Sequence, residues 1–354
     1  MLGYFSVILV TAMVAVSFGN YATSLFLGDD AAAIWVNIFA SLVVVVLTIV
    51  NIVGAEAVSK AQTVIVSVVL VILVAFGIGM LTQINPSLLD PAGYPPARDI
   101  VSSVALTFFA YLGFGVIAFA GGDLKDAKKN LPRAIYIALG FVMILYVALS
   151  IGVFGSLTVD EVIENADTAL AVATQSVFGQ FGFIMTSVAA LFACVGAVNS
   201  QLYGSIGSTY TMAKDGALPP AFGERRRGGK GAPRGLLFSA VLILLMANFF
   251  NVSAIASVGS AVALAIFGLV TVAHLRLRKE TGANRLVLWL ALAGTVVAFV
   301  LFSIYTIQND PKLFVVLAVT IVLAWVVEAI WRGISKRRMA REPDPVAPGL
   351  EDQG

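Results

Sequence analysis

Apolar stretches, each about as long as a membrane crossing, follow one another along most of the chain, and short polar or glycine-containing turns separate them. A bilayer core about 30 Å thick requires roughly 20 mostly apolar residues for one helical crossing. The pattern predicts ten membrane-spanning helices, with approximate bounds of 3–27, 32–53, 60–82, 98–122, 132–156, 178–213, 234–250, 252–275, 285–306 and 312–333. Residues 1–335 are therefore predicted to form one transmembrane domain, followed by a polar, disordered cytoplasmic tail at residues 336–354.

The composition excludes a water-soluble fold. Of the 354 residues, 59% are hydrophobic and 12% are charged, and a soluble domain cannot bury so much apolar surface. Cys194 is the single cysteine, which excludes an intrachain disulfide and a metal site built from paired cysteines. The predicted spans also lack His, Asp and Glu clusters at metal-ligand or catalytic spacing. We therefore predict an all-α, polytopic membrane protein that is not an enzyme and that binds no metal or cofactor.

Positive charge is concentrated in alternate connecting segments. One set of segments, together with the tail after Arg332, holds Lys60, Lys125, Lys128, Lys129, Arg133, Lys214, Arg225, Arg226, Arg227, Lys230, Arg234, Arg276, Arg278, Lys279 and Arg285. The opposite set holds only Arg98 and Lys312, alongside acidic residues. We therefore predict a multi-pass protein of the cell membrane. By the positive-inside rule, the first set of segments and both termini lie in the cytoplasm. The basic loop Gly223–Arg234 is interpreted as a topology signal beside anionic lipid rather than as a nucleic-acid site.

Ionisable side chains are nearly absent from the predicted spans, so a polar site would have to use backbone or neutral groups. Gly113 and Gly115 lie among aromatic residues in the span 98–122. They permit either a helix break that frees backbone N–H and C=O groups or simply close helix packing. Asn199 and Ser200 in the span 178–213 are polar enough to line a cavity or to hydrogen-bond neighbouring helices. The residues alone do not decide between a helix break and close packing at the glycines, or between a cavity lining and interhelical hydrogen bonds at Asn199 and Ser200.

Three motifs are similar to those of one transporter family. Residues 108–135 read FFAYLGFGVIAFAGGDLKDAKKNLPRAI, which combines an aromatic half-helix, a glycine-containing turn and a basic turn. Residues 196–219 contain Asn199-Ser200 and end in YTMAKDGALP, and a further turn reads Asn51-Ile52-Val53-Gly54. In these motifs the chain resembles the amino acid, polyamine and organocation (APC) superfamily of permeases. The resemblance extends over nearly the whole chain. It implies a LeuT-like fold of two inverted five-helix repeats, and secondary active transport of amino acids or related amines by alternating access.

The resemblance also implies a substrate site around a break in the span 98–122. The predicted substrate-binding residues are Phe108, Tyr111, Gly113, Phe114, Gly115, Asn199 and Ser200. The expected partners are a small amino acid or amine, a coupling proton or sodium ion, and membrane lipids, but no nucleic acid. The chain departs from the family where an acidic pair reads Gly122-Asp123, and it has no lysine between Lys60 and Gly79. A lysine in that helix replaces sodium in some proton-coupled relatives, so the coupling ion stays open.

The same correspondence aligns residues 1–27 with the third helix of a twelve-helix permease. We therefore expect the first two helices to be missing from this chain and the fold to be N-terminally incomplete. In the family, the broken first helix faces the broken sixth helix across the substrate. This expectation leaves a second interpretation open, namely a non-transporting membrane scaffold or sensor subunit derived from a permease.

Overall fold

The computed structural model describes the greater part of the chain, and the structural statements below concern that part. The described residues are 2–28, 30–53, 56–96, 99–100, 103–104, 107–108, 110–111, 113, 126–214, 218–222 and 233–309. All regular secondary structure within these ranges is helical. This confirms the predicted all-α fold.

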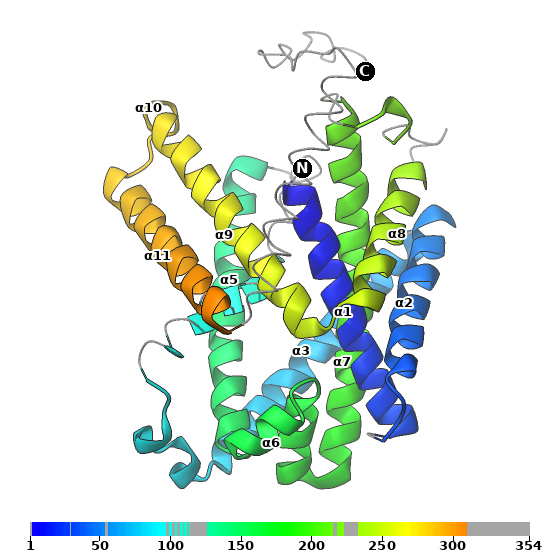
Figure 1. Cartoon of the computed structure of the whole chain (residues 1–354). Coiled ribbons are helices and arrows are strands. Elements are labelled where there is room, and N and C mark those ends of the chain that lie inside the picture. Colours follow the sequence, from blue (N-terminus) through cyan, green and yellow to red (C-terminus); the bar gives the residue numbers. More distant parts are fainter. Residues whose placement is uncertain are drawn as a thin grey trace.

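In the part of the chain that the structure describes, eight long helices form a bundle (Figure 1). They are α1 (Leu2–Leu27), α2 (Ile34–Val53), α3 (Glu56–Thr82), α5 (Ala127–Phe154), α7 (Ala169–Lys214), α8 (Pro233–Phe249), α9 (Val252–Arg276) and α11 (Arg285–Asn309). Short helices connect them: η1 (Pro86–Leu89), η2 (Pro91–Gly93), α6 (Val159–Glu164), η4 (Pro220–Phe222) and α10 (Arg278–Thr281). Among the described residues, seven helices are long and apolar enough to cross a membrane, and α8 is a shorter apolar helix of 17 residues.

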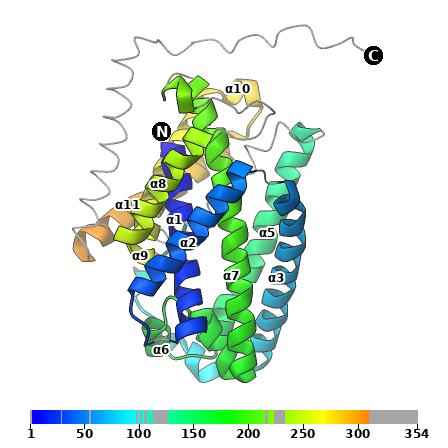
Figure 2. The same ribbon diagram turned by 90° about the vertical axis from the view of Figure 1, so that its right-hand side faces the viewer.

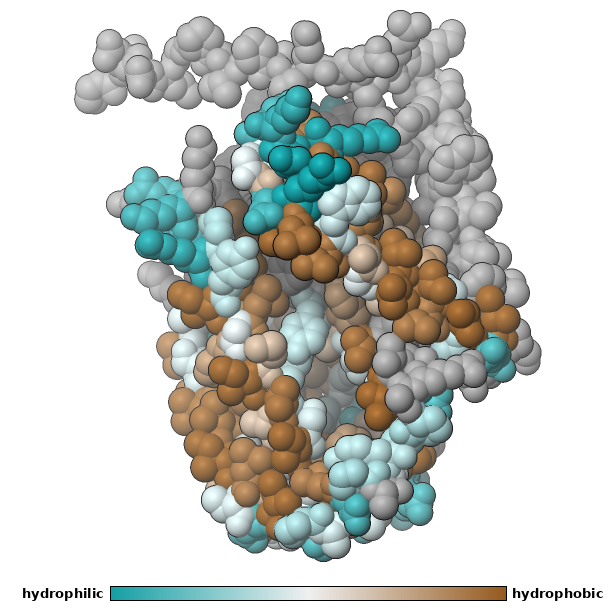
Figure 3. Space-filling view, turned by 90° about the vertical axis from the view of Figure 1, so that its left-hand side faces the viewer, coloured by the Kyte–Doolittle hydropathy of each residue, from teal (hydrophilic) through white to brown (hydrophobic). Residues whose placement is uncertain are grey.

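These helices correspond to eight of the ten predicted spans and confirm a polytopic membrane protein. Most of the span 98–122, all of the span 312–333 and the tail 336–354 lie outside the described residues. On the face in Figure 3, hydrophobic side chains fill the middle and hydrophilic ones gather toward the two ends. This distribution is the one expected for a surface that faces hydrocarbon between two aqueous layers.

The helix α7 departs from the predicted span 178–213 because it begins earlier and folds sharply at Gly179. The backbone of Gly179 has φ 65° and ψ −160°, a conformation that glycine adopts readily and other residues do not. The fold brings the hydroxyl groups of Thr174 and Thr186 within 2.9 Å, although twelve residues separate them. The crossing helix therefore starts after Gly179, and the residues before it form a helix in the connecting segment.

That preceding helix covers the ends of α3 and α5. The Phe178 ring lies 5.1 Å from the Phe76 ring and directly over Gly79 of α3, where a Cβ atom would collide with it. Met80, Leu157 and Ala173 form a small buried cluster at the same place. The segment between residues 156 and 178, which hydropathy treated as a loop, is therefore an ordered helical cap.

The helix α6 in this cap has an ordered N-terminus. The Thr158 backbone N–H and hydroxyl donate to Glu161 Oε2 at 2.7 and 2.8 Å, and the Glu161 N–H donates to Thr158 Oγ1 at 3.3 Å. This reciprocal arrangement is a capping box, and it satisfies N–H groups that have no partner within the helix. The hydrogen bonds from Thr158 lower the pKa of the Glu161 carboxyl.

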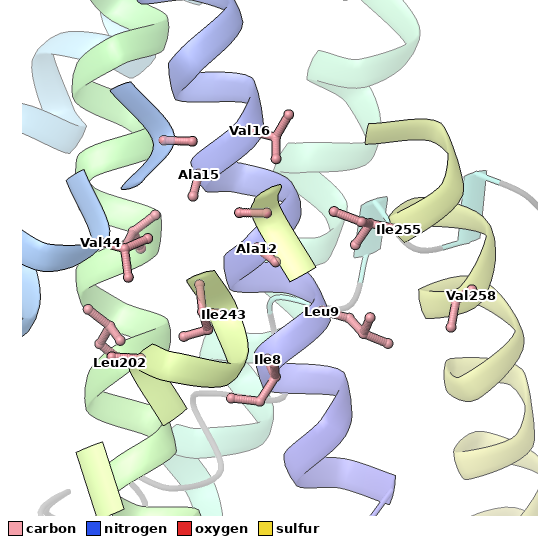
Figure 4. Packing of buried hydrophobic residues seen from close by; sticks show 14 of the residues in the cluster. Ile8, Leu9, Ala12, Ala15, Val16, Val44, Leu202, Ile243, Ile255 and Val258 are labelled. Carbon is pink, nitrogen blue, oxygen red and sulfur yellow. The ribbon is translucent and has the colours of Figure 1, made fainter. Parts of the chain in front are cut away.

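The helix α1 lies at the centre of the bundle, where α2, α7, α8 and α9 all pack against it. Ala12 and Ala15 are fully buried, and Gly19 brings α1 so close to α2 that a Cβ atom would collide with the Val36 carbonyl. Small residues are the usual means of close helix approach in membranes. Figure 4 shows larger side chains around this seam, among them Ile8, Leu9, Val44, Leu202, Ile243 and Ile255. Figure 2 shows α2 and α8 crossing α1 on one side.

The contacts among α1, α2, α3, α7, α8 and α9 are symmetric under exchange of α1 with α7, α2 with α8, and α3 with α9. Under this exchange, the α1–α2 contact corresponds to the α7–α8 contact, and the α1–α8 contact corresponds to α2–α7. The α3–α7 contact corresponds to α1–α9. All six contacts are present. In Figure 1, α1 begins at the end of the bundle where α7 finishes, so the exchanged helices run in opposite directions. The described helices therefore have the arrangement expected of two inverted repeats.

The close approach at Gly19 predicts that Gly19→Val will lower the stability of the protein. The added side chain would meet the Val36 backbone and separate α1 from α2, a form of overpacking that costs about 1–3 kcal/mol. The measurement is the thermal stability of detergent-purified protein by fluorescence-detected size exclusion. Gly140→Val on α5 is the matched control, because an added Cβ meets no described atom within 4 Å there. Equal stability of the two variants would contradict the proposed packing.

Candidate functional site

The described residues between 99 and 113 change their backbone geometry along the segment. Those at 99, 100, 103, 104 and 107 are α-helical, whereas Phe108, Ala110, Tyr111 and Gly113 have 3-10 geometry. The Thr107 hydroxyl still donates to the Ser103 carbonyl at 2.8 Å, as in an α-helix. The change therefore falls between Thr107 and Phe108.

Aromatic side chains hold this segment from two sides. The Phe108 ring meets the Phe267 ring of α9 edge to face, with centroids 5.5 Å apart. The Tyr111 ring meets the Tyr146 ring of α5 in the same manner, also at 5.5 Å. The Tyr146 hydroxyl donates to the Ala110 carbonyl at 3.2 Å. The segment is thus held between α5 and α9.

The predicted glycine positions are only partly described. Gly113 is exposed, and a Cβ atom added to it would meet no described atom within 4 Å. Phe114 and Gly115 lie outside the described residues, so their part in a break stays a prediction. Phe108 and Tyr111 are half-buried, which suits aromatic side chains that line a site.

Asn199 and Ser200 belong to a network of neutral side chains that joins three helices. Asn51 Nδ2 of α2 donates to Asn199 Oδ1 at 2.8 Å, and Asn199 Nδ2 donates to Gln62 Oε1 of α3 at 2.8 Å. Gln62 Nε2 in turn donates to Ser200 Oγ at 2.7 Å and to the Gly196 carbonyl at 3.0 Å. Both polar atoms of the Asn199 side chain are therefore engaged between helices, and Asn199 is buried.

The predicted site residues thus fall into two groups in the structure. The described contacts of Phe108 and Tyr111 go to α9 and α5, whereas those of Asn199 and Ser200 go to α2 and α3. Asn199 and Ser200 form hydrogen bonds between helices, which is one of the two roles that the sequence allowed. Substrate binding by Asn199 and Ser200 stays a prediction. Sequence reasoning did not single out Gln62 as part of the site. The only signal was its polar side chain at the start of an apolar run.

Sequence reasoning also missed Tyr146 and Phe267. Each is an aromatic residue inside an otherwise apolar helix, which is common in membrane proteins and carries no functional signal by itself. Only the contacts with residues 108–111 single them out.

Among the described residues, no group of three His, Cys, Asp or Glu side chains could hold a metal ion. The chemistry that the site offers is that of aromatic faces, hydroxyl groups and non-α backbone. Backbone N–H and C=O groups at a helix break are suited to binding charged groups of a small ligand without a charged side chain.

Inverted repeats of membrane-spanning helices, with a non-α segment held inside the bundle by aromatic residues, define a protein with the architecture of a permease. A family comparison agrees with this class. Residues 1–327 match the model of the amino acid permease family, and the chain belongs to that family.

Individual relatives support the same conclusion. The chain is 35% identical to an uncharacterized protein of Methanocaldococcus jannaschii over 83% of this chain and 68% of that protein. It is 28% identical to the inner membrane transport protein YbaT of Escherichia coli over 81% of this chain and 65% of that protein. It is 26% identical to the branched-chain amino acid permease BcaP of Lactococcus lactis over 70% of this chain and 55% of that protein. The chain thus spans from about half to about two thirds of the length of these relatives.

The amide network predicts that Asn199 and Asn51 stabilise the protein jointly. Asn199→Leu and Asn51→Leu should each lower the free energy of unfolding by about 0.6 kcal/mol, the average for a hydrogen bond between membrane helices, and by no more than about 1.7 kcal/mol. The double variant should lose less than the sum, because both single changes break the same hydrogen bond.

Thr295→Val is the control, since the Thr295 hydroxyl donates to the Ala291 carbonyl of its own helix. Losses that add fully in the double variant would show that the network does not couple α2 to α7. The same measurement on Gln62→Leu tests the connection to α3.

Proposed function

We propose that the protein is a secondary active transporter that moves an amino acid or a related amine across the membrane by alternating access. The observation that carries the proposal is the non-α segment formed by Phe108, Ala110, Tyr111 and Gly113, which aromatic side chains of α5 and α9 hold between these two helices. A stretch of 3-10 geometry within an α-helix often marks a functional hinge. In permeases, the substrate site is typically formed where spanning helices are discontinuous.

Membership of the amino acid permease family supports the substrate class. The relatives named for substrates include a branched-chain amino acid permease, a cationic amino acid transporter and a serine/threonine exchanger. One further relative is a methylthioribose transporter. A panel of labelled leucine, arginine, serine, threonine and methylthioribose therefore covers the chemistry to be tested.

The proposal predicts saturable uptake of at least one member of this panel. The protein, expressed from its complete reading frame and reconstituted into liposomes, should take up label above empty vesicles under an imposed proton or sodium gradient. The gradient that drives uptake identifies the coupling ion. Absence of uptake for every panel member under both gradients, in a folded and correctly inserted protein, would favour a non-transporting scaffold or sensor subunit instead.

Gly113→Leu should abolish this uptake while leaving insertion into the membrane intact. Leucine places apolar bulk beside the proposed substrate path, where the described structure leaves open space around Gly113. The measurement is initial uptake rate divided by the amount of folded, membrane-resident protein. Gly140→Leu on α5 is the matched control, because its added Cβ meets no described atom within 4 Å. Normal uptake by Gly113→Leu would remove this position from the mechanism.

The proposed orientation places α10 in the cytoplasm and α6 outside the cell. Arg276, Arg278 and Lys279 lie at the end of the bundle that carries the N-terminus, and the acidic helix α6 lies at the opposite end (Figure 1). The positive-inside rule assigns the basic end to the cytoplasm.

Single cysteines at exposed positions test this orientation in a Cys194→Ala background. An impermeant thiol reagent added to intact cells should label Glu164→Cys on α6 and leave Lys279→Cys on α10 unlabelled until the cells are opened. The reverse labelling pattern would invert the proposed topology.

A further inference from the structure

Tyr146 of α5 touches the non-α segment through both parts of its side chain. Its hydroxyl donates to the Ala110 carbonyl at 3.2 Å, and its ring packs against the Tyr111 ring at 5.5 Å with an interplanar angle of 64°. One side chain therefore contacts the backbone of Ala110 and the aromatic ring of Tyr111, a predicted site residue.

The hydrogen bond to Ala110 meets a need that arises where the helix leaves α geometry. Hydrogen bonds within a 3-10 helix have poorer geometry than those of an α-helix, so a carbonyl in this segment gains from a second donor at membrane depth, where bulk water is absent. Among the described residues of α5, Tyr146 supplies such a donor to this segment. The bond also limits the position of the Ala110–Tyr111 peptide relative to α5.

The part of α5 that follows Tyr146 packs against α3. One turn beyond Tyr146, Leu149 lies over Gly77 of α3, where a Cβ atom would be 3.3 Å from Leu149 Cδ2. Further along, Gly152 faces the fully buried Met80 side chain at contact distance. The hydroxyl of Tyr146 is thus presented from a helix whose position α3 determines, and rigid helices position site groups more accurately than loops do.

We infer that Tyr146 is a positioning residue of the substrate site, because it fixes the Ala110 peptide and the Tyr111 ring in the geometry that binds substrate. The inference rests on the proposed transport function. Tyr146 acts through its neighbours, so its hydroxyl should influence substrate affinity more than the maximal rate.

The test is Tyr146→Phe, which keeps the ring contact and removes only the hydroxyl. The KM for the panel amino acid with the fastest uptake should rise about three- to tenfold, because one hydrogen bond changes an equilibrium constant by about that factor. The maximal rate per folded protein should change by less than about twofold. Tyr136→Phe is the matched control on the same helix, since Tyr136 is exposed, and its KM should be unchanged. An unchanged KM for Tyr146→Phe, or a loss of thermal stability without a change in KM, would overturn the inference.

A second measurement does not depend on transport. Spin labels at Val104→Cys, one helical turn before the non-α segment, and at Ile163→Cys on α6 of the cap, both exposed positions, report the distance between the helix that leads into the segment and the cap in a Cys194→Ala background. The distance distribution should be narrow with Tyr146 and broader with Tyr146→Phe. If no panel member is transported, the proposed function fails, and this distribution alone decides the positioning role: broadening supports it and an unchanged distribution overturns it.

Discussion

The close packing of small residues along α1 is the constraint on which the bundle depends. Lipid tails are as apolar as the side chains, so helices in a bilayer associate through close contact and hydrogen bonds rather than through the hydrophobic effect. Ala12, Ala15 and Gly19 let neighbouring helices approach α1 closely, and α2, α7, α8 and α9 all pack on it. The α1 helix and its counterpart α7 pack directly on each other, so the two halves that the exchange relates meet at this seam.

Hydrogen bonds between helices add selectivity to this packing. Many buried hydroxyls, such as those of Thr11, Thr48 and Thr209, donate to carbonyls of their own helix and therefore do not choose a partner helix. The Asn199 side chain instead specifies its partner helices, because its Oδ1 accepts a hydrogen bond from Asn51 of α2 and its Nδ2 donates one to Gln62 of α3. A neutral network of this kind joins three helices without the cost of burying charge in the bilayer.

The non-α segment at Phe108–Gly113 differs from the rest of the bundle in what holds it. The helices of the core pack along their length, whereas the described residues of this segment are anchored by side chains on two helices: Phe108 meets Phe267 of α9 and packs against the buried core, and Tyr111 and the Ala110 carbonyl meet Tyr146 of α5. This anchoring supports the proposed role of the segment as a binding element.

The sequence by itself determined the class of fold and the positions of the crossings. Apolar length is a local property that the bilayer imposes on each helix, so predicted bounds such as 252–275 and 285–306 agree closely with Val252–Arg276 and Arg285–Asn309. Only the tertiary structure decided the fold at Gly179, the hydrogen bond of Tyr146 to Ala110 and the partners of Asn199. Those features depend on contacts between distant parts of the chain, such as the 148 residues between Asn51 and Asn199, and no local pattern encodes which polar groups will meet.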